Sequence, residues 1–246
     1  MPHRSRVLEV GAGAGWQAKT LAHEGFSVVA VDVPGTLYLN EREWPVLNYD
    51  GSNLPFPDGQ FDVVFSSHVL EHVSDLENFQ AELKRVLKPN GTAIHVLPTA
   101  TWRFWTSIAY YFFLATKVLE LVLAGSGARK SAKMMSARVS NLRRNGTRAL
   151  FPSRHGETGN VISELYLFSR FRWLALFYRT GWIVERYRPS GVFYTGYALL
   201  GSKLSIGLRR QASYLFGSSS HVFCLKKSLS DLQDACDATV ASDLPT

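Results

Sequence analysis

Short apolar runs alternate with helix-like spacing over residues 6–98 of this chain. Short, mainly apolar runs predict buried strands at residues 7–10, 26–32, 61–65 and 92–97. Between the last two, apolar residues of 76–86 recur at helical spacing, and Ser74 or Asp75 precedes them as a helix cap. Strands that alternate with helices predict a parallel sheet with helices on both faces.

The same alternation resumes later in the chain. A helix is predicted over residues 163–180, ended by Gly181, followed by a sixth strand at residues 182–187. Residues 192–216 form an apolar, basic excursion, and residues 220–225 predict the last strand. The polar residues 228–246 are typical of a loosely held tail.

Residues 99–150 do not follow this pattern. Residues 104–116 carry no charge and are rich in aromatic side chains. No acidic residue lies between Glu120 and Glu157, whereas eight basic residues lie there: Arg129, Lys130, Lys133, Arg138, Arg143, Arg144, Arg148 and Arg154. A spanning helix needs about 20 apolar residues, and Lys117 and Glu120 interrupt this one, so we reject a transmembrane span. Two compatible interpretations remain: an amphipathic lid with a solvated basic loop, or an element over residues 102–150 that binds an anionic membrane surface.

Composition narrows the partners and the compartment. A chain of 246 residues predicts one domain, or one domain with a large insertion. A net charge of +7 favours an anionic partner such as nucleic acid, phospholipid or an acidic substrate. Cys224 and Cys236 make no disulfide framework, and no His/Cys cluster has metal-ligand spacing, so no metal site is predicted. The chain runs directly into its first strand, which predicts no signal peptide and a cytoplasmic location, either free or peripheral on the inner face of the membrane.

A glycine-rich turn follows the first strand. Gly11, Gly13 and Gly15 alternate with alanine there, and Glu9 lies inside the apolar strand. The Gly-x-Gly-x-Gly spacing differs from the Gly-x-Gly-x-x-Gly of dinucleotide-binding turns. An acid beside the loop suits a positively charged ligand better than a pyrophosphate, although a tight turn with nothing bound is the alternative.

Two further acids lie at predicted strand ends. Asp32 ends the second strand, 21 residues after Gly11. Asp50 falls at the carboxyl end of a third strand, which makes residues 61–65 the fourth strand and residues 92–97 the fifth. In a doubly wound sheet these positions meet the glycine loop at one rim, where a carboxylate can accept hydrogen bonds from ribose hydroxyls. The sequence therefore predicts a nucleoside cleft, with turn capping as the alternative role of Asp32.

Several motifs occur together in this order. They are Leu8-Glu-Val-Gly-Ala-Gly-Ala-Gly15, Asp32, Asp50 before Leu54-Pro-Phe-Pro-Asp58, Phe61-Asp-Val-Val64, His68-Val-Leu-Glu-His72 and Arg85-Val-Leu-Lys-Pro-Asn-Gly91. Residues 7–98 thereby resemble the class I S-adenosylmethionine-dependent methyltransferases, especially the group that includes the ubiquinone/menaquinone methyltransferases. That group usually has a helix before the first strand; this chain begins too late for one, so either its start is truncated or the insertion supplies the lid.

The resemblance implies an α/β fold: a Rossmann-like, doubly wound, seven-stranded sheet whose last strand is antiparallel, with a helical, aromatic-rich insertion after strand five. The expected organisation is a cofactor-binding core at residues 1–99, the insertion at 100–154, the rest of the sheet at 155–227 and the tail at 228–246. The implied cofactor is S-adenosyl-L-methionine.

The resemblance also implies roles for individual residues. Glu9, Gly11, Gly13 and Gly15 would hold the methionine end of the cofactor, Asp32 the ribose and Asp50 the adenine amino group. Val33, Gly51, Ser67 and His68 are further cofactor-binding candidates beside them.

Methyl transfer to a hydroxyl also requires removal of a proton, for which histidine is best suited at neutral pH. His72, the second residue of the Glu-His pair, and His155, in a polar loop, are the catalytic candidates, each with a structural role as the alternative; His95 is expected in the core.

The favoured function is a methyltransferase acting on a small-molecule, glycan or lipid-linked acceptor, with oxygen as the expected methylated atom. A nucleic-acid methyltransferase is the first alternative, disfavoured because Ser66-Ser-His68 stands where an Asn-Pro-Pro-Tyr-like motif would be expected. A nucleoside-binding module without chemistry is the second alternative. The loop spacing and Glu9 disfavour a nicotinamide oxidoreductase.

Overall fold

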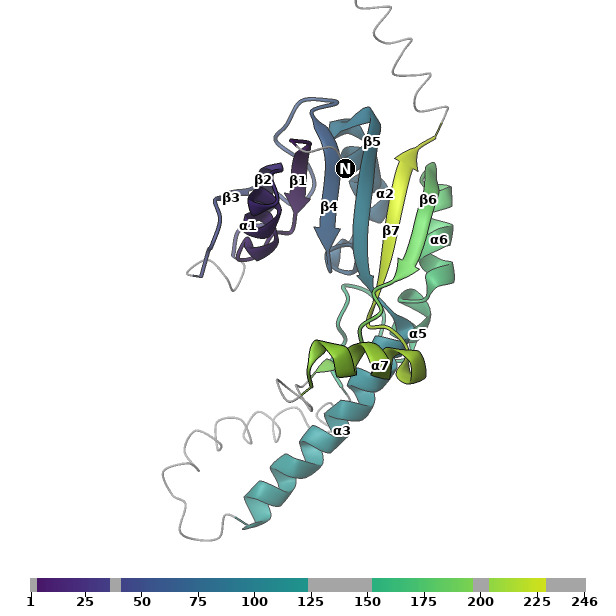
Figure 1. Ribbon diagram of the computed structural model, residues 1–246. Helices are drawn as coiled ribbons and strands as arrows, with labels where there is room; N and C mark the ends of the chain where they lie inside the picture. The colour runs from purple at the N-terminus through teal and green to yellow at the C-terminus, as the bar shows by residue number, and fades with distance from the viewer. Residues whose placement is uncertain (1–3, 36–40, 124–151, 197–203, 229–246) are drawn as a thin grey trace, which may run out of the picture. The chain divides into compact units, whose positions relative to one another are not determined.

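The computed structural model describes residues 4–35, 41–123, 152–196 and 204–228 (Figure 1). Its strands are β1 (Arg6–Val10), β2 (Ser27–Asp32), β3 (Val46–Asn48), β4 (Phe61–Ser67), β5 (Leu87–Pro98), β6 (Trp182–Pro189) and β7 (Ser220–Lys227). Its helices are α1 (Trp16–His23), the 3₁₀ turn η1 (Leu70–His72), α2 (Leu76–Val86), α3 (Ala100–Leu123), α5 (Ser163–Leu167), α6 (Arg170–Arg179) and α7 (Ile206–Phe216).

The seven strands form one sheet in the order β3-β2-β1-β4-β5-β7-β6. Neighbouring strands from β3 to β5 are parallel, whereas β7 lies antiparallel between β5 and β6. This confirms the predicted doubly wound sheet with an antiparallel last strand. The strand order reverses between β1 and β4, and in such sheets the crevice outside the carboxyl ends at this point is the usual ligand site.

The core forms where apolar strands are covered by helices. Leu8 and Val10 of β1 and Val64 of β4 are fully buried, as expected for central strands of a parallel sheet. Helices α1, α2 and α6 contact strands β2, β5 and β6 respectively. His95 is buried in β5, as predicted: its Nδ1 lies 2.8 Å from the Ser66 hydroxyl, and burial lowers its pKa to about 3.

Local caps decide several element boundaries. Asp75, one of the two predicted caps, caps α2 through a 3.1 Å hydrogen bond from the Asn78 amide. The single helix predicted over residues 163–180 is wrong: it is two helices, because Ser169 adopts an extended conformation and caps α6. Strand β5 also starts earlier than predicted, at Leu87 rather than at residue 92.

The chain divides into two compact units. Unit 1 comprises residues 1–98, 169–190 and 220–246 and contains the sheet; unit 2 comprises residues 99–168 and 191–219 and contains α3, α5 and α7. The division places residues 155–168 and 191–219 with the expected insertion, whereas the sequence prediction placed them with the sheet. Of the predicted basic stretch, only Arg154 is among the described residues, and the predicted tail lies outside them almost entirely. Within the part of the chain that the structure describes, no helix is long and apolar enough to cross a membrane.

Candidate functional site

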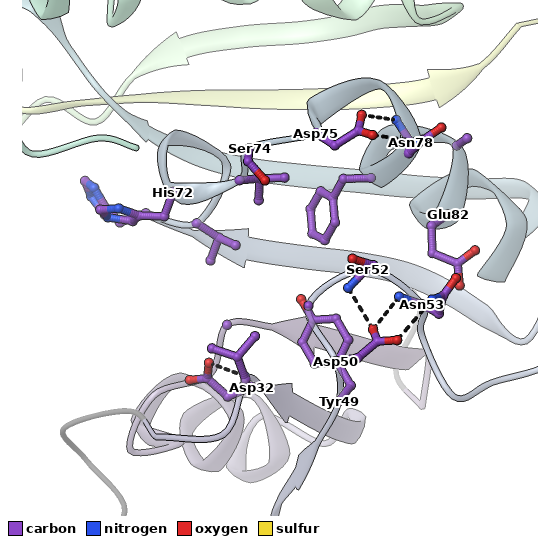
Figure 2. Close-up of a pocket in the computed structure, with 18 of the residues that line it drawn as sticks. Asp32, Tyr49, Asp50, Ser52, Asn53, His72, Ser74, Asp75, Asn78 and Glu82 are labelled. Atoms are coloured by element: carbon purple, nitrogen blue, oxygen red, sulfur yellow. Dashed lines mark hydrogen bonds between the residues drawn. The ribbon is translucent and has the colours of Figure 1, made fainter. Parts of the chain in front are cut away.

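Unit 1 contains a cavity of about 1080 Å³ at the carboxyl ends of β1, β2, β3 and β4 (Figure 2). Its wall includes the glycine loop after β1, Asp32 and Val33 after β2, residues 49–53 after β3, and Ser67 and His68 at the end of β4. His72 and the first turns of α2 complete the wall. The predicted rim is therefore one continuous site, large enough for a nucleoside with a substituent.

The glycine loop has a backbone that other residues would strain. Gly11, Gly13 and Gly15 have φ angles of +73°, +55° and +81°. A Cβ atom at Gly11 would overlap Cγ2 of Val69, and one at Gly15 would lie 2.6 Å from Cβ of Trp44. Gly11 and Gly13 line the cavity, so the missing side chains leave the main chain open to a ligand.

Asp32 connects the end of β2 to the glycine loop. Its Oδ2 accepts a 2.6 Å hydrogen bond from the Gly13 amide, and its Oδ1 accepts a 2.7 Å bond from the Val33 amide. A carboxylate offers about four acceptor positions, so these two bonds leave about two for a ligand. Asp32 therefore braces the loop and still faces the cavity as an acceptor.

Asp50 follows β3 and organises the next turn (Figure 2). Its carboxylate accepts hydrogen bonds from the amides of Ser52 (2.8 Å) and Asn53 (2.6 Å) and from the Asn53 side chain (3.0 Å). The bond from the Asn53 side chain and then these amide bonds lower the pKa of Asp50. Oδ2 carries one of the three bonds, so it retains an acceptor position.

Glu9 is a buried carboxylate in β1, the strand that leads into the glycine loop. It is 1% exposed, and neither carboxylate oxygen makes a hydrogen bond of good geometry with the described residues. Burial raises the pKa of Glu9 to about 7; the Ala18 amide partly offsets this and the charge of Asp32 adds to it. A buried carboxylate with open acceptor positions is suited to a cationic ligand.

Arg85 of α2 holds the loop of the Leu54-Pro-Phe-Pro-Asp58 motif. Its guanidinium donates to the carbonyls of Leu54 (3.0 Å) and Phe56 (2.8 Å) and to the carboxylate of Asp58 (2.7 Å). Glu82 accepts from Arg85 at 2.6 Å and from the Leu54 amide at 2.7 Å. Two motifs far apart in sequence thus form one structural unit at the cavity wall.

Two histidines of the His68-Val-Leu-Glu-His72 motif line the cavity. His68 has a φ of +56°, uncommon for a residue with a side chain. Its Nδ1 lies 3.3 Å from the buried Glu71 carboxylate and its Nε2 lies 3.3 Å from the Ser220 hydroxyl on β7. The side chain of His72 is exposed.

His155, the other predicted base, belongs to unit 2. Its ring contacts Trp102 edge-on at 4.7 Å between centroids, and Glu164 accepts hydrogen bonds from the amides of His155 (2.6 Å) and Gly156 (2.8 Å). Glu164 also pairs with Arg103 at 2.7 Å, and both side chains are buried. Two buried charges thus fix the loop that carries His155.

Several of these residues are not among those predicted from the sequence. Tyr49, buried beside Asp32 and Asp50, has its pKa raised to about 12, chiefly by burial. The carboxylate of Glu71 and the Arg103–Glu164 pair were also not foreseen. For Arg103 there was a signal, a charge at the start of an otherwise apolar helix; Tyr49 offered none.

Known proteins match the same region. Residues 8–95 match the family described as Methyltransferase domain. Demethylmenaquinone methyltransferases from Renibacterium salmoninarum and Tropheryma whipplei are 38% identical over 93 residues and 35% identical over 97 residues, and each match covers 36% of this chain and 39% of the relative. The match thus spans well under half of the length of each of these relatives.

Solved structures extend the likeness to the whole fold. A methyltransferase from Methanosarcina mazei superposes with a TM-score of 0.53 at 17% identity, covering 93% of this chain and 95% of the other. One from Bacillus halodurans gives 0.53 at 15% identity, covering 93% and 94%. At these identities the likeness concerns the fold.

The cavity fits the cofactor that this fold implies. Asp32 retains acceptor positions for hydroxyls, and the glycine loop has no side chains between its main chain and the cavity. Glu9 has open acceptor positions for a cationic group, but it lies buried in β1 and is not among the residues that line the cavity. Motif order, the domain match over residues 8–95 and the fold agree, and this part of the chain is similar to the class I S-adenosylmethionine-dependent methyltransferases.

Proposed function

We propose that this protein transfers the methyl group of S-adenosylmethionine to a small-molecule acceptor, at an oxygen atom. The observation that supports this best is the single cavity that brings together the glycine loop, Asp32 and Asp50, with Glu9 buried in the strand leading into it. A nucleoside with a positively charged substituent is complementary to that set.

The bound cofactor supplies an electrophilic methyl group, so the protein must align the acceptor and remove a proton. We propose His72 as the base, because its exposed imidazole lies in the cavity wall. His155 is the second candidate: the Arg103–Glu164 pair fixes its loop within unit 2. In this proposal Glu9, the glycine loop, Asp32 and Asp50 bind the cofactor, together with Val33, Gly51, Ser67 and His68.

The names of the relatives support a quinone-like small molecule as the acceptor class. We also include glycans and lipid-linked molecules among the proposed acceptors. For a lipid-linked acceptor we propose a cytoplasmic protein that binds peripherally to the inner face of the membrane. The exposed apolar side chains of unit 2 support that part.

Two measurements test the function. Calorimetry should detect binding of S-adenosylmethionine or its demethylated product and negligible binding of NAD; tighter binding of NAD would contradict the proposal. Purified protein should then release S-adenosylhomocysteine with a panel of quinols, phenols and sugar alcohols, and methylated product should appear by mass spectrometry. Cofactor binding without release across the panel would instead favour the nucleoside-binding alternative.

A further inference from the structure

The exposed surface of unit 2 is rich in large apolar side chains. On α3, Phe104, Tyr111, Phe112 and Leu119 are 48%, 48%, 59% and 56% exposed. Tyr111, Phe112 and Leu119 follow Phe104 by seven, eight and fifteen residues. This spacing places all four side chains on one face of the helix. The stripe is therefore a property of one side of α3.

The opposite side of α3 is used within unit 2. Arg103 pairs with Glu164, Thr106 accepts a 2.9 Å hydrogen bond from the Gly196 amide, and Ala109 is buried. The inward side thus combines polar anchors with apolar contacts, among them Trp102 against Phe168. The outward side carries a second apolar stripe, whereas a surface helix usually turns polar residues toward solvent.

Helix α7 adds a second exposed set. None of its residues is buried, and its large apolar side chains are 41% to 90% exposed: Ile206, Leu208, Tyr214, Leu215 and Phe216. The two helices meet at Trp105, whose Nε1–H donates to the Phe216 carbonyl at 2.9 Å and whose ring contacts Phe104 and Phe216. We call these exposed side chains of α3 and α7 the α3–α7 surface.

Charge is distributed unequally between the two units. The sequence of unit 2 contains thirteen Lys and Arg and three Asp and Glu, a net charge of +10, whereas unit 1 has a net charge of −3. One of the three acids, Glu164, is buried and paired with Arg103. Arg154 and Arg210, in contrast, are exposed.

We propose that the α3–α7 surface binds an anionic phospholipid bilayer. A bilayer interface accepts exposed aromatic and aliphatic side chains and attracts basic residues with its headgroups, so one partner accounts for both features. An apolar protein partner would account for the stripe and leave the charge unexplained. The inference rests on the proposed function in one respect only, that membrane binding would bring the enzyme to a lipid-linked acceptor.

Vesicle flotation of the full chain tests this directly. Binding should be strong to vesicles of equal parts phosphatidylcholine and phosphatidylglycerol at low salt, weak to phosphatidylcholine alone, and reduced by salt. Phe112→Ser and Leu215→Ser should each weaken binding about tenfold, as expected for losing a partly inserted apolar side chain. Phe171→Ser is the matched control, because Phe171 is 79% exposed but lies on α6 of unit 1; it should leave binding unchanged.

The charge contribution has its own pair of variants. Arg210→Glu should weaken binding to the anionic vesicles about tenfold, since each basic residue near such a surface contributes to binding. Arg188→Glu, an exposed reversal on β6 of unit 1, should not. Calorimetry with S-adenosylmethionine should give the wild-type affinity for all these variants, which separates failure of this inference from failure of the proposed function.

Several outcomes would overturn the inference. These are absence of flotation with the anionic vesicles at low salt, equal binding to both compositions, or equal losses in Phe112→Ser and Phe171→Ser. Light scattering that shows a dimer abolished by Phe112→Ser would assign the surface to a second copy instead.

Discussion

The Oδ2 atom of Asp32 accepts a 2.6 Å hydrogen bond from the backbone N–H of Gly13. Asp32, which is expected to bind the cofactor ribose, thus also stabilises the conformation of the glycine loop. Asp32 and the loop should therefore respond to substitution together.

Replacing Asp32 with Ala removes both the ligand acceptor and this brace. We expect S-adenosylmethionine affinity to fall by about 1.5–3 kcal/mol, the scale of a hydrogen bond to a charged group. Calorimetry measures the change, with Glu185→Ala, an exposed acid on β6, as the control. An unchanged dissociation constant would leave Asp32 with a turn-capping role alone.

Gly11→Ala should destabilise the protein more than its backbone angle alone requires. The control is Gly59→Ala: Gly59 has a φ of +61° and open space where a Cβ would lie, so its cost should be about 1 kcal/mol. Gly11→Ala also creates the overlap with Val69. We therefore expect its loss in free energy of unfolding, measured by urea denaturation, to exceed that of Gly59→Ala by about 1–3 kcal/mol. Val69→Ala in the same chain should recover part of that difference; no recovery would place the strain elsewhere.

The raised pKa of Glu9, about 7, predicts proton release on cofactor binding. The cationic cofactor favours the ionised carboxylate, so its affinity should rise with pH, by at most about tenfold per pH unit. Above about pH 7 the affinity should level off. Calorimetry in buffers of different ionisation enthalpy measures the released proton. Glu9→Gln should abolish the pH dependence, and an unchanged dependence in that variant would assign it to another group.

The same group affects the stability of the cofactor-free protein with a defined sign. Its pKa is raised from 4.5 to about 7 on folding, so the folded state binds the proton more tightly. Protonation of Glu9 therefore adds up to about 3 kcal/mol to the free energy of unfolding. This contribution is fully present below about pH 4.5 and is lost as the pH rises through about 7. Glu9→Gln should therefore stabilise the protein at pH 8 in thermal unfolding; a destabilised variant would contradict this.

Replacing only one member of the buried Arg103–Glu164 pair should strongly destabilise the protein. Arg103→Ala or Glu164→Ala leaves an uncompensated buried charge, for which we expect a loss of about 3–5 kcal/mol in the free energy of unfolding. The double variant should lose clearly less than the sum of the two. Strictly additive losses would mean that the two side chains act independently.

His72→Ala should lower the rate of S-adenosylhomocysteine release by about 10²–10⁴ with whichever acceptor of the panel is active, while cofactor affinity is unchanged. His155→Ala tests the second candidate in the same assay. The control is His23→Ala, an exposed histidine at the end of α1, which should retain full activity. Full activity in both test variants would favour a carbon or already activated acceptor, for which positioning suffices.

The sequence alone determined the sheet and its rim. Apolar runs and helical spacing specify strands and helices locally, and the glycine loop, Asp32 and Asp50 follow strand ends, so topology brings them together. Buried Glu9 and the capping role of Asp75 could be inferred because each depends on near neighbours in sequence.

The contacts between distant segments became evident from the three-dimensional structure. The brace from Gly13 to Asp32, the Arg85 clamp on residues 54–58 and the pairing of Arg103 with Glu164 depend on side-chain directions that no local pattern encodes. Which side of α3 faces outward was equally undetermined, because its apolar residues predict burial until Arg103 and Thr106 are seen to occupy the inward face.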